Sequence, residues 1–239
     1  MSTEKQRLRM NIWTTMEKRG IATFPRPCFG RIPNFVGSFE AAELLCRSRS
    51  FKKAEVIFVN PDSPQKYVRE RALRDGKILI MPTPRLREGF LLLDSSKIPE
   101  SKVREASTIK GAFKYGVKTV FPPSNLHVDL KVVGSVAVST KGARLGKGGG
   151  YSDLEYAILK ELKLIDELTP IVTTVHPIQI IERIPMNRHD VPVDIIFTPK
   201  NVLKTDRRYE RPKGIYWEYI SIEVIEKIPI LRRLKRMRL

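Results

Sequence analysis

Short apolar runs alternate with longer amphipathic stretches along most of the chain. A run of four to eight apolar residues bounded by turn residues is typical of a buried strand, whereas apolar residues spaced three and four apart are typical of one face of a helix. On this basis we expect strands over residues 55–59, 77–81, 128–138, 171–175 and 194–198, and helices over residues 5–18, 38–46, 64–74 and 154–165.

Nearly continuous apolar strands separated by helices favour a parallel sheet that is buried on both faces. The predicted fold is therefore an α/β three-layer sandwich, in which helices flank a mostly parallel sheet. We assign residues 1–200 to this domain. After Thr198 the chain becomes basic and is interrupted by proline, so we treat residues 201–239 as an extension that packs on the domain and ends in a helical tail.

The composition is that of a folded chain with a sizeable core, because 41% of the 239 residues are hydrophobic and wholly disordered chains have far fewer. The sequence holds no run of about 18 apolar residues, so we expect no transmembrane helix. Its charged start lacks the pattern of a signal peptide. Cys28 and Cys46 alone make neither a metal site nor a redox motif. We therefore expect a cytoplasmic protein.

The charge is strongly positive and spread along the chain. Lys and Arg number 44 against 26 Asp and Glu, for a formal net charge of +18. The last nine residues carry five of the basic side chains, so without them the charge would still be 18 − 5 = +13. Such a balance is compatible with nucleic-acid binding, with a pocket for anionic ligands, or with a merely solvated surface.

A glycine-rich loop over residues 142–153 lies between the longest apolar strand and a well-marked helix. Glycines let backbone N–H groups converge on one point, and the positive N-terminus of the next helix favours an anion there. Arg144 and Lys147 add positive charge, and Tyr151 adds a ring that can stack on a ligand. Ser152 and Glu155 match a capping box, which predicts the helix start. The spacing fits neither the Walker A nor the Rossmann motif, and a flexible turn is the alternative.

Two carboxylates, Asp190 and Asp194, lie just ahead of the apolar run that starts at Ile195. Mg²⁺ is bound in many enzymes by one or two carboxylates together with the phosphates of a substrate. These residues are therefore candidate metal ligands. The alternative is that Asp190 belongs to a turn and the neighbouring His189 to the surface.

Several segments together resemble one family. They are residues 24–27 (FPRP), 31–35 (RIPNF), 82–87 (PTPRLR), 128–138, the glycine loop, residues 189–194 (HDVPVD) and residues 226–231 (EKIPIL). This combination resembles the 5-formyltetrahydrofolate cyclo-ligase family, and within it the methenyltetrahydrofolate synthetase domain-containing proteins. The resemblance covers nearly the whole chain.

The resemblance implies an α/β domain that binds MgATP and a reduced folate, and an enzyme that makes 5,10-methenyltetrahydrofolate from 5-formyltetrahydrofolate through a phosphorylated formyl group. It implies magnesium ligands at Asp153 and Asp190, and folate contacts at Lys147, Gly148, Gly149, Gly150 and Tyr151. The ATP contacts that it implies are Lys5, Arg9, Arg144, Leu145, Gly146, Lys147, Gly148, Gly149, Gly150, Tyr151 and Ser152. It singles out no catalytic residue.

The nucleotide half of the motif set is kept more fully than the folate half. The glutamate that holds the pterin in the family has no direct counterpart in residues 60–65, where Asp62 is the nearest acid. Ser139 and Ser152 also replace an aspartate and a tyrosine of the family pattern. Our leading hypothesis is an ATP-dependent cyclo-ligase or a close relative that acts on a related pterin. The alternative is a non-catalytic protein that binds nucleotide or RNA with the same domain.

Overall fold

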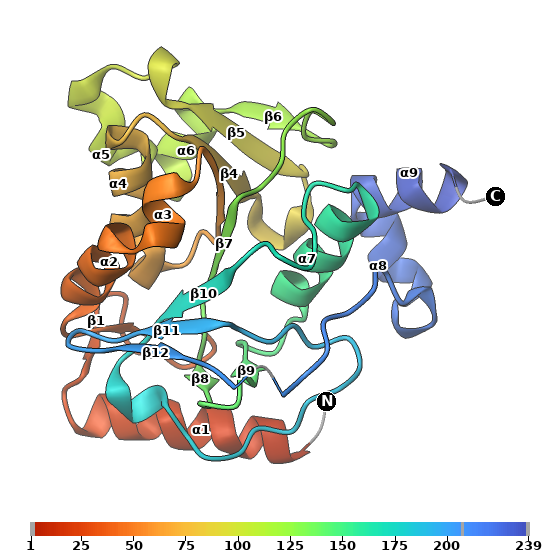
Figure 1. Ribbon diagram of the computed structural model, residues 1–239. Helices are drawn as coiled ribbons and strands as arrows, with labels where there is room; N and C mark the ends of the chain where they lie inside the picture. The colour runs from red at the N-terminus through yellow and green to blue at the C-terminus, as the bar shows by residue number, and fades with distance from the viewer. Residues whose placement is uncertain (1–2, 207, 238–239) are drawn as a thin grey trace.

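The computed structural model describes residues 3–206 and 208–237 and is built around one large sheet (Figure 1). Eight strands form it in the order β12-β11-β10-β7-β3-β4-β5-β6, and two short hairpins, β1-β2 and β8-β9, lie outside it. The strands are β1 (Ala22–Thr23), β2 (Asn34–Phe35), β3 (Val56–Val59), β4 (Ile78–Pro82), β5 (Phe90–Asp94), β6 (Val117–Thr119), β7 (Leu130–Val133), β8 (Ala137–Val138), β9 (Arg144–Leu145), β10 (Ile171–Thr174), β11 (Ile195–Phe197) and β12 (Val202–Lys204).

The sheet is mostly parallel, as predicted. Strands β11, β10, β7, β3 and β4 run parallel to one another. At one edge β12 pairs antiparallel with β11, and at the other edge β5 pairs antiparallel with β4 and β6 pairs antiparallel with β5. The apolar run over residues 128–138 is divided between β7 and β8, because the chain leaves the sheet at Gly134. Strands β5 and β6 lie in a stretch that the apolar pattern left irregular.

Helices cover both faces of the sheet. Helices α2 to α6 lie on one face, and α7 to α9 lie on the other, with α1 below the two small hairpins (Figure 1). The helices are α1 (Thr3–Lys18), α2 (Ser38–Arg47), α3 (Arg49–Lys53), α4 (Lys66–Arg74), α5 (Val103–Ala106), α6 (Ile109–Tyr115), α7 (Tyr151–Glu161), α8 (Ile222–Lys227) and α9 (Pro229–Met237).

The buried side chains form one core on each face because successive residues of a strand point to opposite sides. In β3, Ile57 and Val59 pack with α2 and α4, while Val56 and Phe58 pack on the side of α7. A third apolar cluster joins α1 to the hairpin β8-β9. The long strands therefore read as continuous apolar segments, which is what the sequence pattern indicated.

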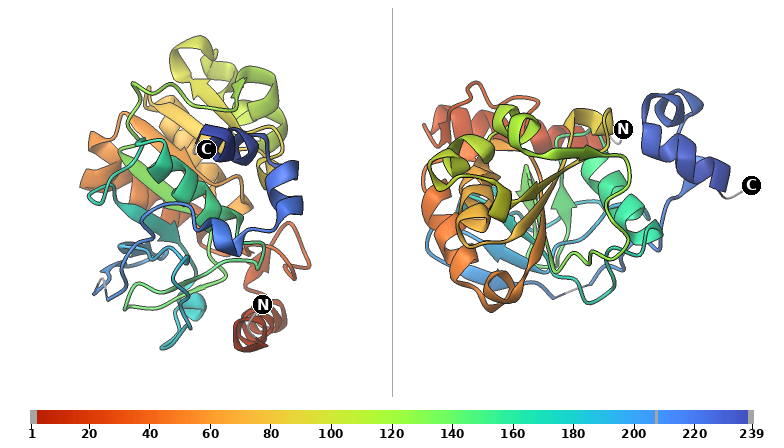
Figure 2. Two further views of the ribbon diagram at one scale, coloured as in Figure 1. Left: turned by 90° about the vertical axis from the view of Figure 1, so that its right-hand side faces the viewer. Right: turned by 90° about the horizontal axis from the view of Figure 1, so that it is seen from above.

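The C-terminal segment packs beside α7, and Figure 2 shows α8 and α9 at one side of the molecule. Ile225, Ile230 and Leu231 are buried in the same core cluster as Ile158 of α7. The helical tail is thus confirmed over the described residues, and Arg238 lies outside them. The domain division at residue 200 stays a prediction.

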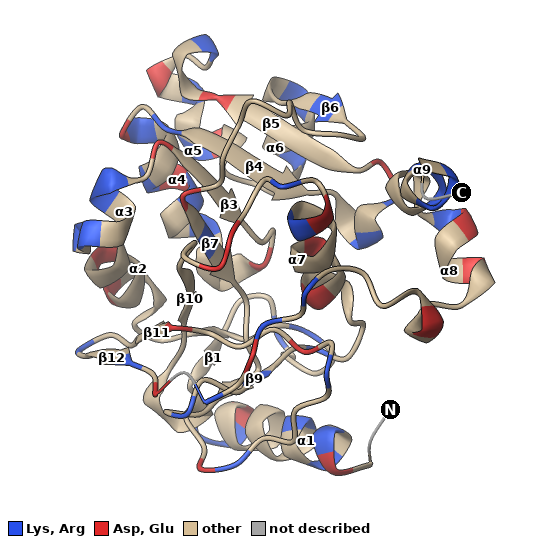
Figure 3. Ribbon diagram, turned by 45° about the vertical axis from the view of Figure 1, so that its right-hand side comes forward, with Lys and Arg blue, Asp and Glu red and all other residues tan. Residues whose placement is uncertain are grey.

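Basic side chains are distributed over several faces, including α1, α3 and α9 (Figure 3). In the ranges 3–206 and 208–237, no helix combines the length and the apolar character that a membrane span requires.

Candidate functional site at the glycine loop

The glycine loop reaches the carboxyl end of the sheet at the point where the strand order reverses. From β3 the chain continues to β4 on one side, while β7 pairs with β3 on the other. Asn60 follows β3 and Gly134 follows β7, so both face this point. Open α/β sheets bind their ligands in the crevice outside such a reversal.

The N-terminus of α7 is open toward the crevice. Gly150 is its N-cap, with a φ of 70°, and no side chain caps the helix there. Gly148 also has a positive φ, of 108°. These conformations strain a residue with a side chain, which explains the glycines. The first N–H groups of a helix have no intrahelical acceptor, so they are available to bind an anion.

The predicted capping box does not form. Ser152 is the second residue of α7 rather than its N-cap, and its hydroxyl lies 3.2 Å from Asn60 Oδ1. Glu155 accepts a 2.6 Å hydrogen bond from Asn60 Nδ2. The S-x-x-E pattern therefore serves the crevice, because both side chains turn to Asn60 instead of to the backbone of the helix.

A cavity of about 540 Å³ lies in the crevice, and we call it the polar cavity. Its polar lining residues include Asn60, Asp62, Arg85, Arg144, Lys147, Tyr151, Ser152, Asp153 and Glu155. Asn60, which is 3% exposed, links the segment after β7 to helix α7. Its Oδ1 accepts a 3.3 Å hydrogen bond from Gly134 N–H, and its amide group holds the carboxylate of Glu155.

A buried lysine lies beneath Asn60 and Glu155, which form the floor of the polar cavity. Lys131 of β7 is fully buried, with its Nζ 3.6 Å from Glu155 Oε2 and 3.8 Å from the centre of the Phe58 ring. Burial lowers the pKa of Lys131, and burial raises the pKa of Glu155, while each charge partly opposes the shift of the other. The Glu155 carboxylate, which lines the cavity, is thus paired with a lysine that is fully buried beneath it.

A second buried cation fixes the loop after β3. Arg69 of α4 donates from Nη1 to the carbonyl oxygens of Asn60 at 2.6 Å and Asp62 at 3.0 Å, and from Nε to that of Ser107 at 2.8 Å. Burial lowers the pKa of Arg69 to about 10, so the side chain remains charged at neutral pH. The backbone of this loop is therefore held from behind the cavity.

Arg144 and Asp153 form the central ion pair of the glycine loop. Arg144 Nη2 lies 2.6 Å from Asp153 Oδ1, which also accepts a 3.0 Å hydrogen bond from the N–H of Val191. Burial lowers the pKa of Arg144, but the facing carboxylates, first of all Asp153, outweigh it and the pKa is raised. Arg144 therefore remains charged although it is buried.

Helix α1 brings two further basic residues to the loop. Lys5 is ion-paired with Asp190, and Arg9 Nε donates to the carbonyl oxygen of Gly146 at 2.8 Å. Both side chains are largely buried. Asp190 also accepts a 2.5 Å hydrogen bond from the N–H of Asn187. The structure thus brings together residues that are up to 185 positions apart, as the predicted nucleotide set requires.

The residues present fit a magnesium ion that is shared with phosphates. Among the described residues, no three Asp, Glu, His or Cys side chains converge on one point. Asp153 and Asp190 each face a basic group at the loop, and one or two carboxylates suffice for Mg²⁺ when a substrate supplies phosphate oxygens. Asp194 is turned away, since it pairs with Arg211 at 2.5 Å.

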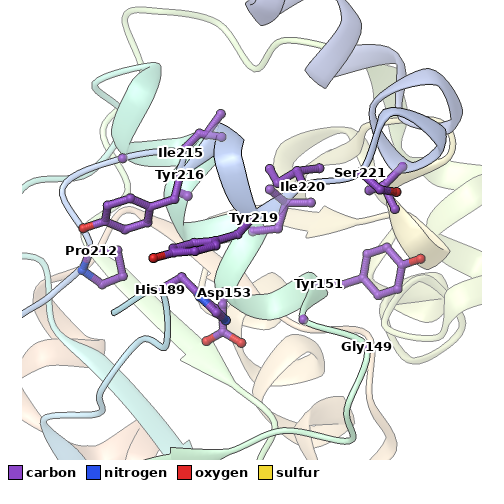
Figure 4. A pocket seen from close by; sticks show the side chains of 15 residues that line it. Gly149, Tyr151, Asp153, His189, Pro212, Ile215, Tyr216, Tyr219, Ile220 and Ser221 are labelled. Carbon is purple, nitrogen blue, oxygen red and sulfur yellow. The ribbon is translucent and has the colours of Figure 1, made fainter. Parts of the chain in front are cut away.

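A second cavity, of about 320 Å³, lies on the other side of the α7 N-terminus, and we call it the aromatic cavity (Figure 4). It shares Gly149, Gly150, Tyr151 and Asp153 with the polar cavity. One wall comes from Tyr216 and Tyr219 in the C-terminal segment. This wall was not predicted from the sequence, although the three aromatic residues among positions 216–219 are a signal for it.

Comparison with known proteins gives a consistent result. Residues 1–199 match the 5-formyltetrahydrofolate cyclo-ligase family. The chain is 44% identical over 236 residues to the methenyltetrahydrofolate synthase domain-containing protein of Bos taurus, in a match that covers 97% of this chain and 62% of that protein. The chain therefore spans less than two thirds of that relative's length.

Two further proteins extend the comparison to enzymes. The 5-formyltetrahydrofolate cyclo-ligase of Escherichia coli (strain K12) is 33% identical over 133 residues, covering 56% of this chain and 69% of that protein. The NMR structure of Aquifex aeolicus 5,10-methenyltetrahydrofolate synthetase aligns with a TM-score of 0.51 at 21% identity, over 90% of this chain and 99% of that one. The latter likeness concerns the fold.

Proposed function

The chain belongs to the 5-formyltetrahydrofolate cyclo-ligase family, and we propose that it converts 5-formyltetrahydrofolate to 5,10-methenyltetrahydrofolate with ATP and Mg²⁺. The observation that carries the proposal is the open N-terminus of α7, which lies among paired basic and acidic side chains at the edge of the polar cavity. This arrangement supports an anion site directly beside a site for a polar ring.

In this proposal the phosphates of ATP lie on the glycine loop. The N–H groups of Gly148 to Ser152 and the helix dipole of α7 attract the anion. Arg144, Lys147, Lys5 and Arg9 supply positive charge around it. Because Arg9 holds the Gly146 carbonyl at 2.8 Å, helix α1 also fixes the shape of the loop.

Asp153 and Asp190 are the proposed magnesium ligands. Bound there with the phosphates, Mg²⁺ would neutralise charge on the transferred phosphoryl group. In its absence each carboxylate faces a basic side chain, Arg144 or Lys5. These basic groups keep both carboxylates in place at the loop.

The polar cavity is the proposed site of the pterin ring. A pterin carries N–H donors and acceptors along one edge, and Asn60 with Glu155 presents complementary groups at 3% and 5% exposure. Glu155 reaches the cavity from α7, so we assign it the contact that residues 60–65 do not supply through a glutamate. Tyr151, at the mouth of both cavities, would contact the folate next to the phosphates.

The reaction needs two bond exchanges. The formyl oxygen on N5 attacks the γ-phosphorus of ATP, the bond from that phosphorus to the bridging oxygen breaks, and ADP leaves. N10 then attacks the activated carbon, loses its proton, and expels phosphate that contains the former formyl oxygen. The chain's task is to orient the two substrates and to hold the phosphate charge, which accounts for most catalysis of phosphoryl transfer.

Two coarser features accompany this proposal. We assign the cyclo-ligase unit to residues 1–200 and a packed extension to residues 201–239. We place the protein in the cytoplasm, where thiols stay reduced; Cys28 and Cys46 are both free. The comparisons favour the enzyme over the RNA-binding alternative.

A direct assay tests the function. The purified protein is mixed with 5-formyltetrahydrofolate and MgATP, and the absorbance of the methenyl product is followed together with ADP release. We expect both products in equal amounts, and none when ATP or Mg²⁺ is omitted. Saturating substrates without methenyl absorbance would refute the proposal.

A further inference from the structure

The aromatic cavity has a wall that lies beyond the residues matched by the family. That match ends at residue 199, whereas Pro212, Ile215, Tyr216, Tyr219 and Val224 all line the cavity. The opposite side is formed by α7 and by the glycine loop. The C-terminal segment thus converts the outer side of the loop from an open surface into a pocket.

The wall presents aromatic rings that have no complete cover. Tyr219 is 58% exposed, and its ring centre lies 6.0 Å from that of Tyr216 and 5.3 Å from that of His189. Figure 4 shows these three side chains close together, with Asp153 beside them. Exposed rings at the edge of an apolar pocket are suited to stacking against a planar ligand.

The wall is held from behind. Ile215 and Ile225 are buried in the core cluster that includes α7, and the Arg188 guanidinium lies 4.9 Å from the centre of the Tyr216 ring. A pocket whose aromatic rings are fixed before a ligand arrives loses less conformational entropy on binding. At about 320 Å³, it lies within the usual size range of small-molecule sites, roughly 300–1,000 Å³.

We propose that the aromatic cavity binds the base of the nucleotide, and that Tyr219 stacks on it. This inference rests on the proposed function, because it assumes phosphates on the glycine loop. Both cavities reach the loop through Tyr151 and Asp153, so a nucleotide held there extends into one or the other. The polar cavity is floored by Asn60 and Glu155, which suit a ring with polar edges. The aromatic cavity remains for the base, and stacking accepts any purine.

The test separates the base from the phosphates. The dissociation constants of ATP and of inorganic tripolyphosphate are measured calorimetrically with Mg²⁺, for the unaltered chain and for Tyr219→Ala. We expect Tyr219→Ala to weaken ATP binding roughly tenfold, as the loss of one stacking contact does, and to leave tripolyphosphate binding unchanged. Tyr219→Phe, which keeps the ring, should retain the affinity for ATP.

Tyr67→Ala is the matched control. Tyr67 is a partly exposed tyrosine that packs edge-on against Phe39, outside both cavities, so its truncation should change neither constant. A measurement without substitution adds a second readout. Trp217, two residues before Tyr219, should change its fluorescence with MgATP and not with magnesium tripolyphosphate.

The outcomes separate the two proposals. If ATP binds equally well to the unaltered chain and to Tyr219→Ala, the base lies elsewhere and this inference is wrong, while the proposed function stands. If neither ATP nor tripolyphosphate binds the unaltered chain, the phosphate site itself is wrong and the proposed function fails with it. Equal loss of both ligands in Tyr219→Ala would show a general disturbance of the loop and overturn the stacking role.

Discussion

The polar and aromatic cavities meet at Asp153 and Tyr151 but are lined by side chains of different chemistry. The polar cavity is lined by hydrogen-bonding groups that are largely buried, such as Asn60 and Glu155, and Lys131 lies below them. The aromatic cavity is walled by rings and aliphatic side chains, of which Tyr219 is more than half exposed.

This difference determines how each cavity can discriminate between ligands. A buried polar group that loses its partner costs the free energy of its desolvation, so the polar cavity should respond sharply to single-atom changes. Stacking depends on area and tolerates changes in the ring. We therefore expect the polar cavity to set specificity and the aromatic cavity to add affinity.

The largest effect is expected at the shared carboxylate. Asp153→Asn keeps an acceptor for Arg144 and for the N–H of Val191 but removes the charge that a metal requires. We expect the rate of methenyl formation to fall by roughly 10²–10³-fold, as after the loss of one preorganised electrostatic contact in an active site. The change is measured with saturating 5-formyltetrahydrofolate and MgATP.

The control for this variant is a thermal unfolding curve, which shows whether the chain still folds; the curve should shift to a lower temperature, because the buried Arg144 loses the charge of its partner. If Asp153→Asn folds normally and turns over at the unaltered rate, Asp153 is not a magnesium ligand, and the two cavities do not meet at the reacting centre.

The next largest effect concerns the floor of the polar cavity. Glu155→Gln leaves Lys131 buried without its carboxylate, and we expect the free energy of unfolding to fall by about 3–5 kcal/mol, as when one partner of a buried ion pair is removed. Combining it with Lys131→Met should recover most of the loss. Urea unfolding of both variants measures this, and a Glu155→Gln chain as stable as the original would contradict the buried pair.

A smaller effect is expected behind the same cavity. Arg69→Met leaves the carbonyl oxygens of Asn60, Asp62 and Ser107 without their donor, at a cost of about 2–3 kcal/mol in unfolding free energy. The KM for 5-formyltetrahydrofolate should rise more than that for ATP, because the loop lines the polar cavity alone. Equal rises in both KM values would contradict a separate role for the polar cavity in binding 5-formyltetrahydrofolate.

The smallest change in stability is expected at the mouth of the polar cavity. The ion pair between Lys147 and Asp62 has an N–O distance of 2.9 Å, and the Lys147 side chain is 45% exposed. Exposed pairs contribute little, so Lys147→Met should change the unfolding free energy by less than about 1 kcal/mol. The KM for ATP should nevertheless rise, because a charge beside the phosphates is lost. An unchanged KM would remove Lys147 from the phosphate site.

The sequence predicted the parallel strands and the glycine loop well because both depend on local pattern. The run Val56–Val59 is apolar on both faces, and Gly142, Gly148 and Gly150 of the loop adopt conformations that other residues avoid. Strand β5 was missed, because Phe90–Asp94 lies among turn-forming prolines and glycines and pairs with the chain on an antiparallel edge.

The remaining features depend on contacts between distant parts of the chain. Glu155 matches a capping pattern but faces Asn60, which is 95 positions away. Arg69 reads as an ordinary charged helix residue, and only the fold shows that it is fully buried and holds the loop after β3. The aromatic wall likewise depends on the packing of the C-terminal segment beside α7.

The most direct test of the proposed reaction is an isotope-labelling experiment that traces the formyl oxygen atom. 5-Formyltetrahydrofolate labelled with ¹⁸O in its formyl group is converted with unlabelled MgATP, and the released phosphate is analysed by mass spectrometry. A cyclo-ligase that phosphorylates the formyl oxygen must deliver one ¹⁸O atom to each phosphate. Methenyl product accompanied by unlabelled phosphate would contradict the account.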